Sequence, residues 1–229
     1  MKKIIVLLLA LTMVFAFASC TTDDPSVKSE GVMTYAEYAA AALDSEVVIE
    51  AYVQGKQSWW ENKGTFYLQD KDGGYFVYEM ACTEEEYNKM TVGTKLKVTG
   101  HKAEWSGEVE IIDATFEILD GNYVAEPTDV TALLGKDELI EKQNMLVSFN
   151  DLTIESVSYK NDEPGDDIYV TVSKDGVNYD FCVEIYLTGA DTDVYKAFAD
   201  LKQGDVVDIE GFLYWYNGVN THITAVTVK

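Results

Sequence analysis

Apolar and polar residues alternate along most of the chain, in short runs that are rich in β-branched and aromatic side chains. In the first half, these runs predict strands at residues 47–54, 65–69, 75–78, 95–105 and 108–118. In the second half, they predict a long strand or bent pair at 145–158, then strands at 167–172, 177–187, 205–216 and 221–228. A Lys-Asp-Gly turn divides the second run from the third in both halves, at 71–73 and 174–176. The pattern predicts a mainly β protein.

Short helices are expected where a capping residue precedes a helical pattern. Two capping boxes, each a threonine with a glutamate three residues later, are Thr34 with Glu37 and Thr83 with Glu86. Asp191 is the expected N-cap of a helix that places Val194, Phe198 and Leu201 on one face. A further helical element is expected after Pro127. One helix thus falls between the third and fourth strands of each half.

A frame of glycines occurs twice. "GTKLKVTGHKAEWSG" at 93–107 and "GDVVDIEGFLYWYNG" at 204–218 both place glycine at every seventh residue and tryptophan shortly before the last one. In each half, the first glycine precedes the fourth strand, the second lies within that strand, and the third forms the final hairpin turn. A glycine within a strand permits the sharp bend that a small barrel needs.

The order of three strands, a helix and two strands resembles the OB-fold, a five-stranded Greek-key barrel. The phrases "GTKLKVTG" and "GDVVDIEG", with the downstream tryptophan and glycine, are similar to OB-fold modules of bacterial surface lipoproteins and secreted nucleases. The resemblance implies two tandem OB-like barrels, each with a short helix between strands three and four, plus short N-terminal helices. We place barrel 1 at 32–120 and barrel 2 at 121–229, with a linker at about 120–127.

The first residues have the features of an export signal. Lys2 and Lys3 precede an apolar run that is too short to span a bilayer, and small residues follow it. The sequence Phe17-Ala18-Ser19-Cys20 resembles the bacterial lipobox, which implies a signal peptide at 1–19 and a lipid on Cys20. Residues 20–31 are then expected to be a flexible tether. We expect an exported protein, lipid-anchored to the bacterial cell membrane or the outer-membrane surface.

The charge of the chain bears on its partners. The formal net charge is -23, and the sequence contains no arginine. Nucleic-acid affinity comes largely from cationic side chains that release counterions from phosphate. Nucleic acid is therefore disfavoured as a partner, and the acidity is interpreted as a solvated surface.

Catalytic motifs are missing from the sequence. It contains no nucleophile elbow, no zinc-protease motif and no P-loop, and its two histidines, His101 and His222, lie at non-equivalent positions. We predict that the protein is not an enzyme and has no cofactor and no metal site, although the acidic loop at 161–167 leaves calcium open. Cys82 and Cys182 are interpreted as buried free thiols, with a disulfide between them as the alternative.

Aromatic residues are the candidate ligand contacts. In OB-folds, ligands lie across strands two and three, between the loops that join strands one to two and four to five. The residues expected there in barrel 1 are Trp59, Trp60, Tyr67, Tyr78 and Trp105, with a secondary set at the matching turn of barrel 2, Tyr214, Trp215 and Tyr216. The same rings are also suited to packing within a barrel or between the two barrels.

Three functions follow from these features. The leading hypothesis is an extracellular binding protein for a polymer, preferably a glycan, stacked on the rings of barrel 1. The alternatives are a single-stranded nucleic-acid-binding OB protein and a structural or protein-assembly module of the cell surface. The sequence leaves the oligomeric state open.

Overall fold

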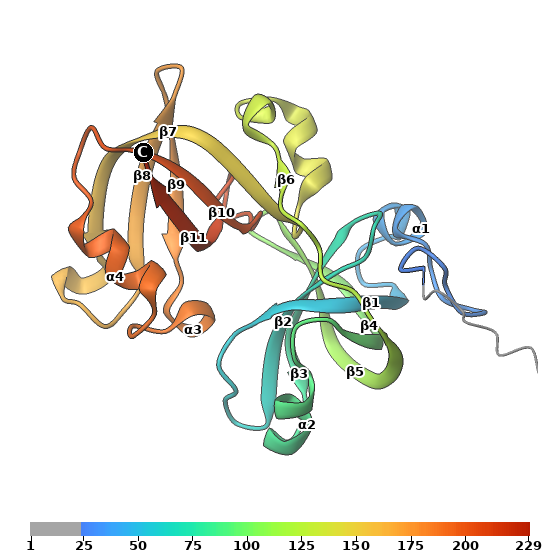
Figure 1. The fold of residues 1–229 in the computed structure, drawn as a ribbon. Coiled ribbons are helices and arrows are strands. Elements are labelled where there is room, and N and C mark those ends of the chain that lie inside the picture. Colours follow the sequence, from blue (N-terminus) through green and yellow to red (C-terminus); the bar gives the residue numbers. More distant parts are fainter. Residues whose placement is uncertain (1–23) are drawn as a thin grey trace, which may run out of the picture.

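The computed structural model describes residues 24–229, and the expected signal peptide and Cys20 lie outside them. Short helix α1 (Tyr35–Ala40) precedes five strands and a second helix: β1 (Glu46–Lys56), β2 (Lys63–Gln69), β3 (Gly74–Ala81), α2 (Glu84–Lys89), β4 (Thr94–Trp105) and β5 (Glu108–Asn122). These strands form a closed barrel in the order β1-β2-β3-β5-β4, which we call barrel 1 (Figure 1). Both predicted capping boxes are present, at the N-termini of α1 and α2.

The second half begins with a short strand and two 3-10 helices, β6 (Thr128–Asp129), η1 (Thr131–Leu133) and η2 (Asp137–Lys142). Its barrel elements are β7 (Leu146–Tyr159), η3 (Lys160–Asp162), β8 (Ile168–Lys174), β9 (Val177–Val183), α3 (Ile185–Thr188), α4 (Asp193–Asp200), β10 (Val206–Phe212) and β11 (His222–Val228). The strand order is β10-β11-β9-β8-β7-β6, and β7 also pairs with β10. Strands β7–β11 therefore close in the same order as barrel 1, and we call them barrel 2. The protein is mainly β, with two OB-like barrels.

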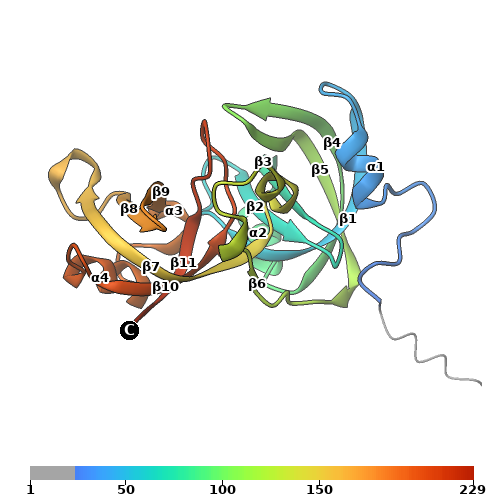
Figure 2. The ribbon, with the colours of Figure 1, turned by 90° about the horizontal axis from the view of Figure 1, so that it is seen from above.

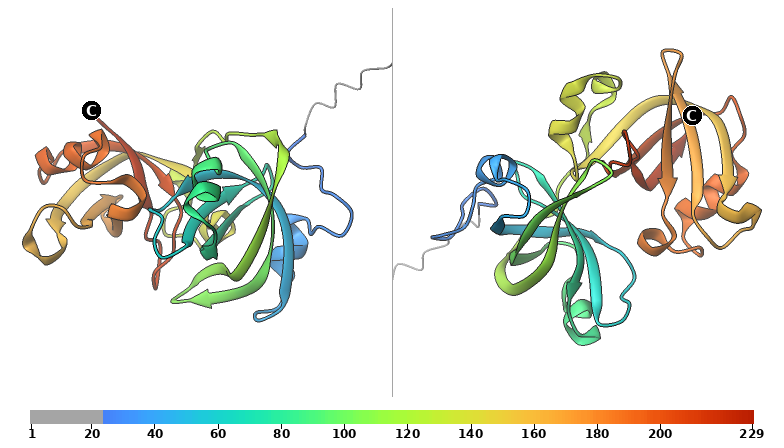
Figure 3. Two further views of the ribbon diagram at one scale, coloured as in Figure 1. Left: turned by 90° about the horizontal axis from the view of Figure 1, so that it is seen from below. Right: turned by 180° about the vertical axis from the view of Figure 1, so that it is seen from behind.

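The two barrels lie side by side, with α1 on the outer side of barrel 1 and α4 at the far end of barrel 2 (Figures 2 and 3). The expected helix after Pro127 is instead β6 followed by the 3-10 helices η1 and η2. The predicted strand 177–187 ends at Val183, because Glu184 caps the short helix α3. The N-cap of α4 is Thr192, one residue later than the predicted Asp191. Among residues 24–229, no helix is long and apolar enough to cross a bilayer.

The mid-strand glycines lie at equivalent bends of the two barrels. The pairing of β4 with β5 shifts register between Thr99 and His101, and that of β10 with β11 shifts between Glu210 and Gly211. A Cβ on Gly100 would lie 2.8 Å from the backbone oxygen of Ile112, and one on Gly211 would lie 2.4 Å from that of His222. These contacts are too close for any side chain, so the glycine frame is explained by backbone crowding at the two barrel corners.

The described part of the predicted flexible tether packs against barrel 1. Lys28 is nearly buried, and its ammonium donates to the backbone oxygen of Glu50, 2.6 Å away, and to the carboxylate of Asp70. Asp70 is completely buried and also accepts hydrogen bonds from the backbone N–H of Gly73 and the hydroxyl of Tyr75. Residues 24–31 are therefore an ordered segment, because a buried carboxylate holds their only lysine.

Removing this lysine should destabilise the protein. We expect Lys28→Ala to lower the free energy of unfolding by about 3–5 kcal/mol, because it leaves the buried Asp70 side chain without its cationic partner. Lys71→Ala is the matched control, since Lys71 pairs with Asp24 at the surface, with both side chains about half exposed, and should cost less than about 1 kcal/mol. Urea unfolding followed by tryptophan fluorescence measures both, and equal losses would contradict the role of the buried pair.

Candidate nucleobase-binding groove

Barrel 2 covers part of the face of barrel 1 on which OB-folds bind ligands. Alternation along β2 and β3 points Phe66, Leu68, Tyr75 and Val77 into the core of barrel 1 and leaves Tyr67, Phe76 and Tyr78 on its outer face. Barrel 2 and the segment leading to it cover Tyr67 and Phe76 with Leu146, Leu187, Phe212 and Tyr214. We call this apolar cluster the junction. Only the Tyr78 end of the face remains open.

The predicted ligand contact at Tyr67 is wrong. Its ring is fully buried and stacks in parallel on that of Phe212, with ring centroids 4.2 Å apart and planes at 3°. Its hydroxyl lies 2.8 Å from Nδ1 of His222. Tyr67 therefore joins the two barrels and presents no free face to a ligand.

The adjacent tryptophans of barrel 1 have different roles. Trp59 is half-buried, and its indole N–H donates to the backbone oxygen of Cys82 over 3.0 Å. Trp60 is 72% exposed, at a tight turn in which it and Lys63 exchange two backbone hydrogen bonds. Glu61 and Asn62 have positive φ at the tip of this turn, which holds the chain in a narrow loop. The loop presents Trp60 to solvent and turns Trp59 toward the barrel.

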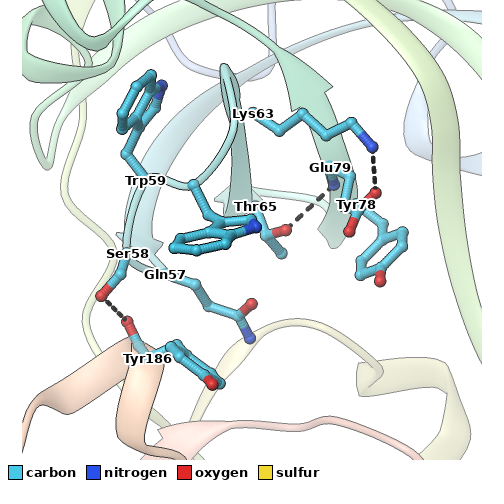
Figure 4. Close-up of a pocket in the computed structure, with 9 residues that line it drawn as sticks. Gln57, Ser58, Trp59, Lys63, Thr65, Tyr78, Glu79 and Tyr186 are labelled. Carbon is cyan, nitrogen blue, oxygen red and sulfur yellow. Dashed lines mark hydrogen bonds and ion pairs between the residues drawn. The ribbon is translucent and has the colours of Figure 1, made fainter.

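Trp60 borders an open cavity of about 370 Å³ that both barrels line. The other lining residues are Gln57, Ser58, Trp59, Lys63, Thr65, Tyr78, Glu79 and Tyr186 (Figure 4). Lys63 pairs with Glu79 over 2.6 Å. Tyr186 comes from α3 of barrel 2, where its backbone oxygen accepts hydrogen bonds from the N–H and hydroxyl of Ser58.

A second cavity, of about 260 Å³, continues the first. It is lined by Gln57, Phe76, Tyr78, Trp105, Glu110, Tyr214 and His222, so the two cavities share Gln57 and Tyr78. Trp105 is half-exposed and packs on the half-exposed Tyr216, with ring centroids 5.2 Å apart. We call the two cavities together the aromatic groove. Its exposed rings come from both barrels.

The charges along the groove are few and mostly negative. Lys63 is the only cation among the described residues that line it. Burial raises the pKa of the Glu110 carboxyl, and the nearby Glu79 raises it further. Burial lowers the pKa of His222 to about 3, so its ring is neutral. The groove thus offers aromatic faces and hydrogen-bonding groups and almost no positive charge.

In the secondary aromatic set at the turn of barrel 2, Tyr214 and Trp215 are packed against other residues and Tyr216 is exposed. Tyr214 stacks on His222, with ring centroids 4.2 Å apart, and burial raises the pKa of its hydroxyl. Trp215 packs on the turn of barrel 1, where a Cβ on Gly107 would lie 2.8 Å from its ring. Tyr216 is exposed beside Trp105. The two equivalent tryptophans, Trp105 and Trp215, therefore differ in role.

Sequence reasoning missed several groove residues, among them Gln57, Glu110 and Tyr186. Gln57 follows the end of β1 and Glu110 lies on β5, and both belong to residue types that are common on any surface. Tyr186 was assigned to a strand, and only the carboxylate cap of Glu184 on α3 places it at the groove. The N-cap would have been a usable signal for a helical turn.

The other candidate sites have structural roles. Cys82 and Cys182 are free and buried, and burial raises the pKa of both thiols. In the acidic loop, Lys160 pairs with Asp166 and Asp167. Within residues 24–229, no group of three or more acidic, histidine or cysteine side chains is arranged to hold a metal ion.

No known protein family matches the chain, and no curated protein matches its sequence. Among solved structures, a murine DNA-binding protein bound to double-stranded DNA is similar, with 10% identity, a TM-score of 0.37, and coverage of 80% of this chain and 94% of that one. The p202 HIN1 domain in complex with a 12-mer double-stranded DNA has 12% identity and a TM-score of 0.37, with 83% and 96% covered. The Ifi202 HINa domain with a 20-bp double-stranded DNA has 11% identity and a TM-score of 0.35, with 82% and 98% covered.

These comparisons correct two expectations from the sequence. Those structures are complexes of proteins with double-stranded DNA, whereas the sequence led us to prefer a glycan ligand and to disfavour nucleic acid. The burial of Tyr67 removes a central ring of the flat platform on which the glycan hypothesis rested.

Proposed function

We propose that the protein binds unpaired bases of single-stranded nucleic acid by stacking them in the aromatic groove. The observation that carries the proposal is the set of exposed rings around one open groove, supplied by Trp60, Tyr78, Trp105, Tyr186 and Tyr216. Base-on-aromatic stacking contributes about 1–3 kcal/mol per base and tolerates any sequence, because every base has an aromatic face. The groove also occupies the open part of the face on which OB-folds bind ligands.

The proposal assigns the affinity to stacking. A groove with a single lysine, itself paired with Glu79, neutralises very few phosphates. We therefore propose a weak binder of short, unpaired segments, with duplex DNA excluded because its bases are already stacked on one another. Export, a lipid on Cys20 and the absence of enzymatic activity remain part of the proposal, so the ligand would be met outside the cell.

A shallow salt dependence is the first expected result. We expect the affinity of residues 24–229 for an eight-nucleotide thymidine oligomer to change less than about threefold between 50 and 500 mM NaCl. A protein that neutralises phosphates would lose affinity steeply, with a slope of about 0.7 per phosphate contacted in single strands. Quenching of tryptophan fluorescence gives the binding curve. A steep loss with salt, or preference for duplex DNA, would contradict stacking as the source of affinity.

Removing the most exposed ring should weaken binding. We expect Trp60→Ala to reduce the affinity for the same oligomer by about tenfold or more, as expected for one lost stacking partner. Tyr169→Ala is the matched control, since Tyr169 is an exposed ring on β8 of barrel 2 that does not line the groove. Fluorescence anisotropy of a labelled oligomer measures both variants. The proposal fails if the two variants bind alike.

A further inference from the structure

One end of the aromatic groove is lined by polar side chains as well as by rings. Gln57, Glu110 and His222 line the 260 Å³ cavity together with the rings of Phe76, Tyr78, Trp105 and Tyr214. Aromatic walls around a few polar groups are typical of a site that orients a flat ligand by its edge. What these polar groups donate and accept therefore decides which base fits.

His222 presents a hydrogen-bond donor. Its Nδ1 lies 2.8 Å from the buried hydroxyl of Tyr67, for which no other acceptor is present among the described residues. A buried hydroxyl needs an acceptor, so the hydroxyl donates to Nδ1 and the ring proton resides on Nε2. Stacking on Tyr214 fixes the plane of the ring. The edge of His222 that remains for the cavity is therefore a neutral N–H.

Glu110 presents two acceptors without a partner. Its side chain is half-buried on β5, and within residues 24–229 no cation or hydrogen-bond donor engages its carboxylate. A partly desolvated carboxylate gains most from a ligand that brings two parallel N–H groups. Gln57, whose amide both donates and accepts, lies where the two cavities meet.

We propose that this end of the groove selects guanine. The Glu110 carboxylate accepts the N1–H and the exocyclic amine of the base, His222 Nε2–H donates to O6, and Tyr78 and Trp105 stack on its faces. Guanine alone among the common bases has two adjacent donors beside a carbonyl oxygen on its Watson–Crick edge. Adenine and cytosine direct a ring nitrogen acceptor at the carboxylate, and thymine and uracil flank a single N–H with two carbonyl oxygens. This selectivity rests on the proposed function of the groove.

The test uses uncharged nucleosides, so that phosphate repulsion does not enter. Tryptophan fluorescence should give guanosine an affinity at least tenfold higher than that of adenosine or cytidine. Inosine, which lacks only the exocyclic amine, should fall between guanosine and adenosine. Glu110→Gln should reduce the guanosine affinity tenfold or more, measured beside the binding of the thymidine oligomer. Glu104→Gln, a change at an exposed carboxylate on β4 that does not line the cavity, should leave both unchanged.

The outcomes separate the two proposals. Equal binding of all four nucleosides, or equal binding of guanosine and inosine, would overturn guanine selection even if the thymidine oligomer still binds. A guanosine preference that survives Glu110→Gln would overturn the role of the carboxylate. Loss of binding to every nucleoside and to the oligomer would overturn the proposed function itself.

Discussion

Truncating Phe212 to alanine should destabilise the whole protein by about 3–5 kcal/mol, the range for removing a buried aromatic ring. Phe212 is nearly fully buried and stacks on Tyr67 of the other barrel. It also fills the space above Gly55, where a Cβ would lie 2.5 Å from its ring. Its removal would leave a cavity bordered by residues of both barrels, and neither barrel alone can close it.

The same change should alter how the two barrels unfold. In the parent protein, the shared junction should make urea unfolding a single transition, with fluorescence and circular dichroism giving the same midpoint. In Phe212→Ala, we expect the two signals to separate, because fluorescence reports the surroundings of four tryptophans, one of which packs on the other barrel, whereas circular dichroism reports the strands of both barrels.

Tyr216→Ala provides the matched control. Tyr216 belongs to the same turn region of barrel 2, but its ring is about half exposed beside Trp105. Tyr216→Ala should lower the free energy of unfolding by less than about 1 kcal/mol, and urea unfolding should remain a single transition. If both variants lose equal stability, the junction is not what couples the barrels.

The contrast between Tyr67 and Tyr78 shows what the sequence could predict and what it could not. Alternation along β2 and β3 correctly places both rings on the outer face of barrel 1. Which of them remains exposed depends on where Phe212 meets that face, and that contact joins positions 145 residues apart in the chain. The sequence describes each barrel well, because the alternation of apolar and polar residues and the residues that form turns are both local features. How barrel 1 and barrel 2 pack together depends on the shapes of their surfaces, and a local sequence pattern does not predict those shapes.

The glycine frame and the two tryptophans make the same point. Backbone crowding at Gly100 and Gly211 is the same in both barrels, so the repeated glycines were a sound guide to the fold. Trp105 and Trp215 occupy equivalent positions, yet Trp215 packs closely on Gly107 of the other barrel, whereas Trp105 lies half exposed against Tyr216. Equivalent positions in two barrels share backbone constraints, but each barrel has a different neighbour, so their side chains acquire different roles.

A buried carboxyl that contacts both barrels should make the stability of the protein depend on pH. Glu108 is completely buried on β5, and its Oε2 accepts the backbone N–H of Trp215 at 2.8 Å and the amide of Gln143 at 3.1 Å. Burial raises its pKa to about 8, and the hydrogen bonds from Trp215, Asn144 and Gln143 only partly oppose this rise.

The hydrogen bonding around Glu108 supports a protonated acid. Oε1 of Glu108 is buried without a hydrogen-bond partner among the described residues. A buried charge is costly when one of its oxygens lacks a donor, whereas the neutral acid carries a hydroxyl there and no charge. The folded protein therefore favours the neutral acid near pH 7.

The sign of the effect follows from the direction of the pKa change. The pKa is about 8 in the folded protein and near its ordinary value of 4.5 in the unfolded chain, so the folded state binds the proton more tightly. The stability contributed by the neutral acid is complete below pH 4.5 and is lost as pH rises through 8. A pKa difference of this size changes the free energy of unfolding by at most about 5 kcal/mol, and we expect to observe about 3 kcal/mol of that change.

Glu108→Gln tests this account, because glutamine is neutral at every pH and its amide can donate where the acid hydroxyl does. Urea unfolding between pH 5 and 9 should show the variant close to the parent at pH 5 and about 3 kcal/mol more stable at pH 9. Burial also raises the pKa of Glu184, to about 7, and lowers that of His222, but both groups are present in parent and variant and cancel in the difference. Glu117→Gln, at an exposed position of the same strand, should follow the parent curve. A variant that is less stable than the parent at pH 9 would mean that the folded protein holds Glu108 as a carboxylate.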